Sequence, residues 1–453
     1  MAGWDRIEVM LQHEFTQLRE EGRFIDPALV ERAKTLRGDA AIEAFFEELR
    51  PLPMDPTYPY AEPDAFAKIT AKAIALDPVK AIPFAFFFGA LLGRCIGCAL
   101  GKPLETGPYF WESTKANPGW KNVRRWFEGA DAYPIRDYVP AHSRAEKDGL
   151  YVVCPDSQKD HIKFMETDDD IRYTLIGLEL VERHGSGFTP YQVGKRWHDM
   201  LPYQFVCTAE TQAYLNFAHV TRHLSWSDDF LHPEDADYVR THVNPYREWI
   251  GAQIRCDGFA YAAAGDPLLA ARMAWQDATF SHVKNGVYGE MFFAALISAA
   301  FVEKDVDRCL EIALSVIPER SRLYAYLTRT IAVAKASKTQ IGLLESVWEY
   351  LLDFNCTHTI NNACACVASI VFAKGDFSLA VTTAVHFGLD TDCNGATVGS
   401  FMGALLGTSK IPPHWTEPLH DTLYAQLPGY HPIAISEVAR RFQRAWSKIR
   451  FAK

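Results

Sequence analysis

Two short segments of this chain place acidic side chains next to one another, and each is followed by an apolar run. The first is TDDDIRYTLIGLEL (167–180) and the second is DTDCNGATVGS (390–400). Neighbouring carboxylates repel one another, and a bound cation would neutralise them. Oxygen ligands from Asp and Thr suit a hard ion such as Mg²⁺, Mn²⁺ or Ca²⁺. The residues concerned are Thr167, Asp168, Asp169, Asp170, Asp390 and Asp392.

Helix capping is the alternative explanation for both acidic segments. Each lies where a helical pattern begins, so Thr167 can cap a helix and the acids of the first turn can complement its dipole. Capping accounts for one or two carboxylates, but not for three in a row or for both Asp390 and Asp392. The DTDCN segment also looks like an Asp-x-Asp phosphatase nucleophile, a motif that needs a preceding strand. Residue types alone leave metal binding and capping open.

The elements that must position these acids are helices. Apolar residues recur at spacings of three and four in the segments 169–185, 266–280, 285–304 and 436–451, and strand-like alternation is scarce. The pattern predicts an all-α fold. Two segments also carry glycine at every fourth position, GALLGRCIGCALG (89–101) and GATVGSFMGALLG (395–407). Such stripes allow two helix backbones to approach closely, and we expect these two helices to face each other.

The chain divides into an N-terminal extension (1–80) and a main domain (81–453). Residues 5–50 predict two amphipathic helices, and the proline-rich connector 50–63 is expected to lie over the main domain, before a further helix at 64–76. An irregular, aromatic-rich insertion occupies about 106–165. Connections of this length are often functional, so a lid or binding loop is expected there.

Composition excludes several classes of protein. The net charge of −10 and the lack of a basic run disfavour nucleic acid as a partner. The most apolar run, residues 81–93, is too short to cross a membrane, which favours a buried helix. Ten cysteines without a signal-peptide pattern indicate reduced thiols in the cytoplasm. The pairs Cys95/Cys98 and Cys364/Cys366 lack a second pair at zinc-finger spacing.

Four segments in this order resemble the ADP-ribosylglycohydrolase family: GALLGRCIGCALGKPLE, TDDDIRYTLIGLEL, GDPLLAARMAWQDATFSH and AVHFGLDTDCNGATVGSFMGALLG. That family includes the enzyme that removes ADP-ribose from dinitrogenase reductase and the J1-type crystallins of jellyfish. The resemblance covers roughly residues 82–415. The first eighty residues and the insertion have no counterpart in the short members, which makes this a longer, divergent branch.

The resemblance implies a compact, orthogonal all-α bundle with two Mg²⁺ ions between two helix N-termini. It implies Glu105 as an acidic residue near the scissile bond, and either Asp169 or Glu105 as the base. Two positions depart from the family pattern, since Asp170 and Cys393 stand where the family has threonine. A thiol is a poor ligand for a hard ion, so one metal position is expected to be weakened or to take Asn394 or water instead. The implied metal ligands are Thr167, Asp168, Asp169, Asp390 and Asp392.

Candidate substrate contacts come from two glycine-containing segments. IGAQIR supplies Gly251 and Arg255, which suit a diphosphate, and SHVKNGVYGE supplies a turn before a helix. From that turn we take His282, Asn285 and Gly286, of which His282 also ends the third family segment. Each of these residues can instead be a cap or a satisfied core polar group.

Together these features predict a metal-dependent glycohydrolase. It would cleave the C1 glycosidic bond of an ADP-ribosyl group, carried by a protein or by a small molecule, through an oxocarbenium-like state. Metal ions would hold the ribose hydroxyls and orient the attacking water, while a carboxylate takes its proton. The alternatives are a hydrolase of another N-riboside and a non-catalytic, crystallin-like binding protein. No oligomeric state is predicted.

Overall fold

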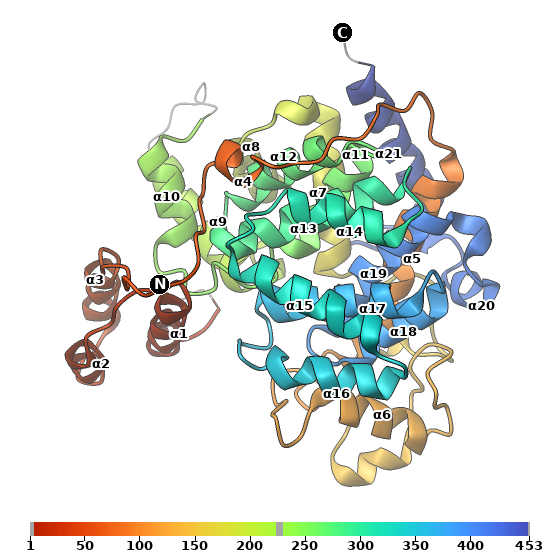
Figure 1. Ribbon diagram of the computed structural model, residues 1–453, viewed down its shortest axis with the longest axis horizontal. Coiled ribbons are helices and arrows are strands. Elements are labelled where there is room, and N and C mark those ends of the chain that lie inside the picture. Colours follow the sequence, from red (N-terminus) through yellow and green to blue (C-terminus); the bar gives the residue numbers. More distant parts are fainter. Residues whose placement is uncertain (1–3, 223–229, 452–453) are drawn as a thin grey trace.

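The protein has an all-α fold, as predicted. The computed structural model describes residues 4–222 and 230–451, which fold into helices joined by connections of varied length (Figure 1). Within those residues the sheet content is one antiparallel pair, β1 (Thr422–Leu423) with β2 (Ile433–Ala434).

The described part of the N-terminal extension contains four helices, of which the first three share a second hydrophobic cluster and the last packs into the main core through Ile69. These are α1 (Ile7–Glu20), α2 (Pro27–Ala33), α3 (Asp39–Leu49) and the single turn α4 (Phe66–Ile69). The second of the two helices predicted within residues 5–50 is therefore divided into α2 and α3, and α3 begins after Gly38, whose φ is 84°. The helix predicted over 64–76 ends at Ile69, and farther along the backbone N–H of Ile74 donates to Ser315 Oγ rather than to a helical carbonyl.

The remaining helices form the body of the protein. The predicted helices at 169, 266, 285 and 436 begin within one residue of those positions. In chain order the elements are α5 (Phe84–Gly101), α6 (Gly119–Gly129), α7 (Asp169–His184), α8 (Pro190–Met200), α9 (Thr208–Thr221), α10 (Pro233–Thr241), α11 (Cys256–Ala262), α12 (Pro267–Ala278), α13 (Lys284–Ala300), α14 (Val306–Ser315), α15 (Arg322–Ala336), α16 (Gln340–Leu351), α17 (Thr359–Ala373), α18 (Phe377–His386), α19 (Thr391–Leu406), α20 (Pro413–Thr416) and α21 (Ile435–Arg450).

Helices α5 and α19 pack along their glycine stripes, which confirms that the two stripes face each other. A Cβ atom added to Gly97 would lie 1.8 Å from the carbonyl oxygen of Gly395, and one added to Gly93 would lie 2.1 Å from that of Gly399. No side chain fits at these positions, so the two backbones are in direct contact. This contact is the centre of the core.

Helix α5 is also the one segment of the described chain with the length and composition of a membrane-crossing helix. The segment is Phe84–Leu104, longer than the apolar run at 81–93, because glycines and cysteines extend it beyond Arg94. In this fold 78% of its most apolar stretch is buried inside the protein. Helices α19 and α21 pack against it, as expected of a core helix.

The insertion at 106–165 is ordered and packed. It contains α6, whose Trp120, Trp126 and Phe127 are buried in the main core. Its Tyr109 carbonyl accepts a hydrogen bond of 3.2 Å from the backbone N–H of Leu389, the residue before Asp390. The insertion therefore reaches the second acidic segment.

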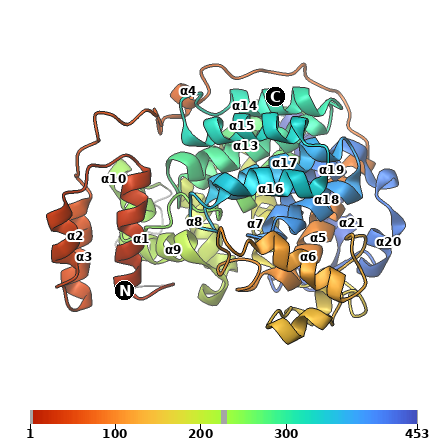
Figure 2. The same ribbon diagram turned by 60° about the horizontal axis from the view of Figure 1, so that its bottom comes forward.

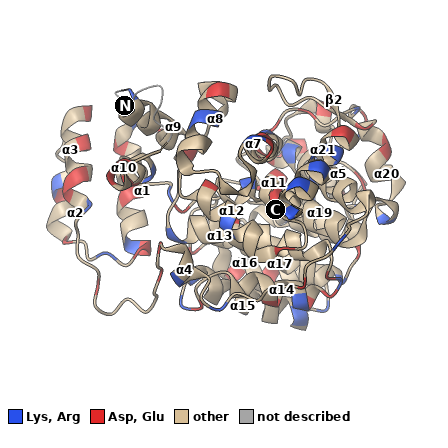
Figure 3. Ribbon diagram, turned by 90° about the horizontal axis from the view of Figure 1, so that it is seen from above, with Lys and Arg blue, Asp and Glu red and all other residues tan. Residues whose placement is uncertain are grey.

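Charged residues of both signs are spread over the helices (Figure 3). Basic positions are most concentrated on α21, in its sequence ISEVARRFQRAWSKIR. Part of this charge is already neutralised within the fold, since Arg441 forms ion pairs of 2.9 Å with Glu179 and 2.5 Å with Glu182.

Replacement of Gly97 by alanine should be severely destabilising. The added methyl group would overlap the Gly395 backbone, which cannot move without separating α5 from α19. We expect the free energy of unfolding to fall by about 3 kcal/mol or more in chemical denaturation. The control is Gly187→Ala, because a Cβ at Gly187 meets nothing within 4 Å. Equal stability of the two variants would contradict this account of the packing.

Candidate active site

The two acidic segments meet at the N-termini of α7 and α19. Asp168 is the N-cap of α7, where its Oδ1 accepts a 3.0 Å hydrogen bond from the backbone N–H of Asp170. Asp390 is the N-cap residue of α19 but makes no side-chain capping bond. Asp168, rather than Thr167, is thus the capping residue, and side-chain capping does not account for Asp390.

The glycine packing of α5 and α19 sets the position of the second segment. A Cβ at Gly101 would lie 2.1 Å from the carbonyl oxygen of Thr391, and the Thr391 hydroxyl donates to the Gly101 carbonyl at 2.9 Å. The C-terminal end of α5 is therefore fixed against the first residue of α19. The turn after α5 carries Lys102 and Glu105 into the site.

The acidic side chains form two overlapping clusters within the described chain. In one, ligand atoms of Cys98, Asp168, Asp170 and Asp392 lie within 4.8 Å of one another. In the other, those of Asp390, Asp392 and Cys393 do so. All members are buried, and Asp392 belongs to both clusters. It therefore joins the two halves of the site.

The first half already contains cationic side chains. Lys102 Nζ lies 2.5 Å from Asp168 Oδ2 and is largely shielded from solvent. Arg94 is fully buried and pairs with Asp170 at 2.8 Å and with Asp257 at 2.6 Å. The additional negative charge of Asp170 is thus matched by a buried arginine. Sequence reasoning missed Lys102, although it stands within the GKPLE end of the first family segment.

In the second half, around Asp390 and Asp392, no lysine or arginine of the described chain forms an ion pair with either carboxylate. Burial and the neighbouring charges of Asp392 and Asp390 raise the pKa of Glu105 well above its usual range. Burial and Asp168 raise the pKa of Asp392 to about 6, and burial and Asp392 raise that of Asp390 well above its usual range. By contrast, Lys102 outweighs the opposing effect of burial and holds the pKa of Asp168 below its usual range.

Oxygen atoms in this half also lack hydrogen-bond partners. Asp390 Oδ1 and Asp392 Oδ1 are buried, and within the described chain no donor reaches them. Buried anionic oxygens without donors are costly unless a cation is near. The donor set therefore fits a hard divalent cation beside Asp390 and Asp392. Asn394 is not available as a substitute ligand, since its side chain bonds to Asn362 at 2.8 Å and to Cys366 at 3.3 Å.

The Thr167 hydroxyl forms hydrogen bonds to protein groups. It donates to the carbonyl of Ala425 at 2.9 Å and accepts from Arg172 at 2.7 Å. These bonds tie the start of α7 to the C-terminal part of the chain. The hydroxyl thus has two protein partners in addition to any role at a metal.

A cavity of about 570 Å³ opens beside the acidic residues. Of the predicted site residues it reaches Glu105, Asp169, Asp390 and Gly251, together with Cys393. Its remaining lining residues are Trp4, Asp5, His13, Phe110, Trp111, Tyr173, Cys207, Thr208, Glu210, Trp249, Ile250, Ile254, Asn355, Cys356 and Thr357.

Four predicted substrate-binding residues do not line this cavity and make structural contacts instead. Arg255 is buried and pairs with Glu210 at 2.6 Å and with Asp277 at 2.5 Å. The buried side chain of His282 contacts Ser281 Oγ at 2.8 Å. The other two are Asn285 and Gly286.

Asn285 and Gly286 are occupied by structural contacts at the start of α13. Asn285 Nδ2 donates to Glu62 at 2.7 Å, and its Oδ1 accepts from the backbone N–H of Leu323 at 3.0 Å. A Cβ at Gly286 would lie 2.7 Å from the carbonyl oxygen of Arg247. These partners lie far away in the sequence, so the turn pattern alone did not reveal them.

The cavity also contains residues that sequence reasoning missed. Glu210 lines it, and burial raises the pKa of this carboxyl to about 7 despite its ion pair with Arg255. Arg255 thus acts on the cavity indirectly, through Glu210. Trp4, Asp5 and His13 come from the N-terminal extension, for which the sequence offered no functional signal.

Comparisons with known proteins identify a family and 46 similar chains of solved structures. The family model described as ADP-ribosylglycohydrolase matches residues 81–448. A solved structure described as an ADP-ribosylglycohydrolase-related protein complex is similar at 18% sequence identity and a TM-score of 0.47. The similarity covers 81% of this chain and 98% of the other. No curated protein matches the chain significantly.

Divalent ions should stabilise the protein through Asp392. We expect Mg²⁺ or Mn²⁺, at roughly 100 times its dissociation constant, to raise the free energy of unfolding by about 3 kcal/mol. Asp392→Asn should abolish this gain, and Asp77→Asn, an exposed control, should keep it. A thermal shift that is the same in all three proteins would contradict this assignment.

Without metal, the same variant should change the pH dependence of stability. A carboxyl whose pKa is raised to about 6 in the folded state binds more protons there than in the unfolded state. Stability is therefore lost as pH rises from about 4 through 6. In EDTA the wild-type Tm should fall over this range, and that of Asp392→Asn should fall less. Parallel Tm profiles would contradict the prediction.

Proposed function

Because the chain belongs to the ADP-ribosylglycohydrolase family, we propose that it cleaves the C1 glycosidic bond of an ADP-ribosyl group on a protein or a small molecule. The observation that carries the proposal is the cavity of about 570 Å³, which has Glu105, Asp169 and Asp390 in its wall. Hydrolysis at ribose C1 develops positive charge on the sugar. Carboxylates beside the sugar stabilise that charge, and the cavity has the volume of a small-molecule site.

Glu105 is the proposed proton-transfer residue. It comes directly after the short turn Lys102–Leu104 at the end of α5, and its carboxyl lines the cavity. Burial and the nearby aspartates raise its pKa well above its usual range, so it holds a proton at higher pH than an ordinary glutamate does. Asp169 also lines the cavity, and burial and Asp168 raise its pKa. Asp169 is therefore the second candidate for this role.

We propose one divalent cation in this site, in place of the two implied by the family resemblance. Asp390 and Asp392 would hold it, because their Oδ1 atoms have no donor among the described residues, with Asp169 beside them at the cavity. Asp168 is already paired with Lys102. A bound divalent ion would supply Lewis-acid attraction for the ribose hydroxyls. The Lys102 ammonium would take the place of the second cation.

A riboside without a diphosphate is the second candidate substrate. Among the described residues that line the cavity there is no lysine or arginine, while Asp5, Glu105, Asp169, Glu210 and Asp390 are acidic. A diphosphate would meet more repulsion there than an uncharged nucleoside. A purely binding, crystallin-like role would not account for the buried, unpaired oxygens of Asp390 and Asp392.

The cytoplasm is the proposed location. All ten cysteines are free thiols in this structure, and most of them are buried. Reduced cysteines in this number fit a reducing compartment.

Turnover should depend on Glu105. The protein would be incubated with ADP-ribosylated peptides, O-acetyl-ADP-ribose and nucleosides, with and without Mg²⁺, and ribose-containing products followed by mass spectrometry. We expect Glu105→Gln to lower kcat by about a hundredfold or more through loss of proton transfer. Asp169→Asn tests the second candidate for the same role.

The matched control is Glu345→Gln, on the exposed side of α16. It should retain full activity. Release of no product from any member of the panel would refute the proposed hydrolysis, and full turnover by Glu105→Gln would refute the role of Glu105. Cleavage of nucleosides alone would favour the second substrate class.

Metal stoichiometry should depend on Lys102. We expect calorimetric titration with Mn²⁺ to give one ion per wild-type chain. Lys102→Met removes the ammonium from Asp168 and should allow a second ion to bind, whereas Lys102→Arg should keep one. Two ions in the wild-type protein would contradict the proposal.

A further inference from the structure

The N-terminal extension contributes one wall of the cavity. Trp4, Asp5 and His13 line it together with Glu105 and Asp169. The family model begins only at residue 81, so these three residues lie outside the part of the chain that defines the family. The cavity is therefore incomplete without a segment that precedes the family domain.

Helix α1 is packed firmly against the body of the protein. Its apolar side forms a second hydrophobic cluster with Ala209, Val243, Tyr246 and Trp249. The Tyr246 hydroxyl donates to Asp5 Oδ2 at 2.8 Å. The His13 ring meets the Trp249 ring edge-on at 5.3 Å between centroids. Figure 2 shows α1 to α3 standing beside α9 and α10.

Buried ion pairs hold the end of α1 in place. Arg247 pairs with Glu14 at 2.6 Å and with Glu21 at 2.7 Å, and Gln17 donates to Glu248 at 2.9 Å. Separation of the extension would break these ion pairs, which are shielded from solvent in the folded protein.

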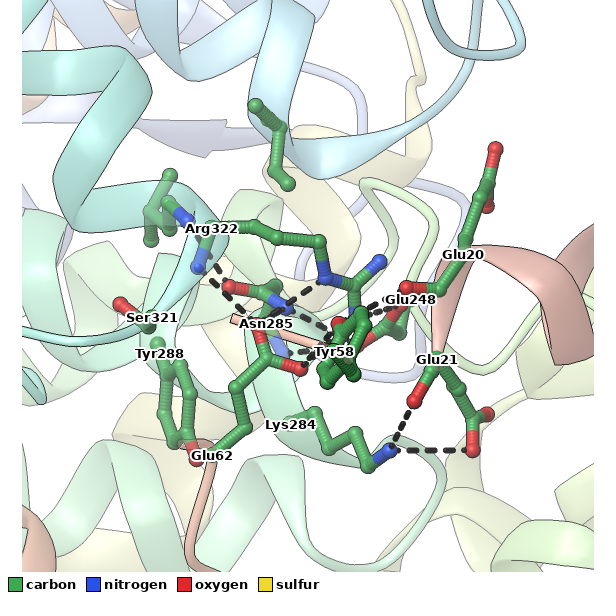
Figure 4. Close-up of polar contacts among 12 residues, drawn as sticks. Glu20, Glu21, Tyr58, Glu62, Glu248, Lys284, Asn285, Tyr288, Ser321 and Arg322 are labelled. Carbon is green, nitrogen blue, oxygen red and sulfur yellow. Dashed lines mark hydrogen bonds and ion pairs between the residues drawn. The ribbon is translucent and has the colours of Figure 1, made fainter. Parts of the chain in front are cut away.

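The proline-rich connector (50–63) joins the ion-pair network through Glu248, the hydrogen-bond partner of Gln17. Arg322 pairs with Glu62 of the connector at 2.8 Å and with Glu248 at 2.7 Å, next to Asn285 (Figure 4). The Tyr58 hydroxyl donates to the carbonyl of Glu20 at 2.9 Å. The N-terminal wall is thus a fixed part of the cavity.

Three tryptophans of the described chain line the cavity, of which one comes from the N-terminal extension. Trp4 is 53% exposed and Trp111, from the insertion, is 58% exposed, and both line the cavity. Trp249 also lines it and is nearly buried. Large aromatic side chains left accessible at a cavity offer π-faces on which a planar base can stack. The carboxylates that would act on ribose line the same space.

We propose that Trp4 and the N-terminal wall bind the aromatic base of the substrate, while the acidic residues hold the ribose. The inference rests on the proposed function only for the identity of the ligand as a base-containing riboside. It applies equally to ADP-ribose and to a nucleoside. Trp111 of the insertion contributes a second aromatic side chain to the same subsite, so a segment before the family domain and a segment within it together bind the base.

Binding measurements on Trp4 variants test this inference. Dissociation constants of adenosine, ADP-ribose and ribose 5-phosphate would be measured by calorimetry with the full-length chain in Mg²⁺. Trp4→Ala should weaken binding of adenosine and ADP-ribose by about tenfold, because a stacking partner is lost. Ribose 5-phosphate, which has no base, should bind as in the wild type. Trp4→Phe should restore most of the loss.

The matched control is Phe24→Ala. Phe24 is also in the extension and is 56% exposed, but it does not line the cavity. It should leave all three affinities unchanged. Equal affinities in Trp4→Ala and wild type, with unchanged Tm, would overturn the inference, as would equal weakening of ribose 5-phosphate or no binding of either base-containing ligand.

The two proposals can fail separately. Base-dependent binding through Trp4 without cleavage of any compound in the substrate panel would support the base subsite and refute the hydrolase. Cleavage of a panel compound with no effect of Trp4→Ala on binding would support the hydrolase and refute the base subsite.

Discussion

The backbone contact between α5 and α19 is the interaction on which the rest of the structure depends. Glycine at every fourth position removes the side chains that would separate the two helices, so carbonyl oxygens of one lie against Cα atoms of the other. This contact fixes the end of α5 against Thr391. It thereby sets the distance between the turn that carries Lys102 and Glu105 and the aspartates at the start of α19.

Charge balance then distinguishes the two halves of the site. Asp168 pairs with Lys102, and Asp170 shares Arg94 with Asp257, so that half already contains two cationic side chains. The half around Asp390 and Asp392 has no such cation, and the Oδ1 atoms of both residues lack hydrogen-bond partners among the described residues. The acidic residues thus form a buried ion-pair network around Asp168 and Asp170. Around Asp390 and Asp392 they form a buried group of carboxylates without a cationic partner in the described chain.

Features that depend on local pattern could be predicted from the sequence. Apolar spacing located the helices, and glycine spacing predicted the close pair, because both depend on residues near one another in the chain. The acidic segments could be grouped because each begins a helix.

Features that depend on distant partners could not be predicted in this way. Asn285 and Arg255 are polar residues at suitable turns, but Glu62, Glu210 and Asp277 already bind them. Lys102 was missed because a single lysine has no periodicity. Trp4 and His13 were missed because nothing local shows that the extension folds back onto the cavity.

The glycine pairing also has a consequence for the order in which the chain acquires its structure. Gly101 and Thr391 are separated by 290 positions, so α5 leaves the ribosome long before its partner exists. Fourteen of its residues are buried in the finished protein. Until α19 is made, this apolar, side-chain-poor surface has no complement, and such surfaces favour aggregation of incomplete chains. The packing of α19 against α5 completes the core and buries the surface of α5 through which incomplete chains could aggregate.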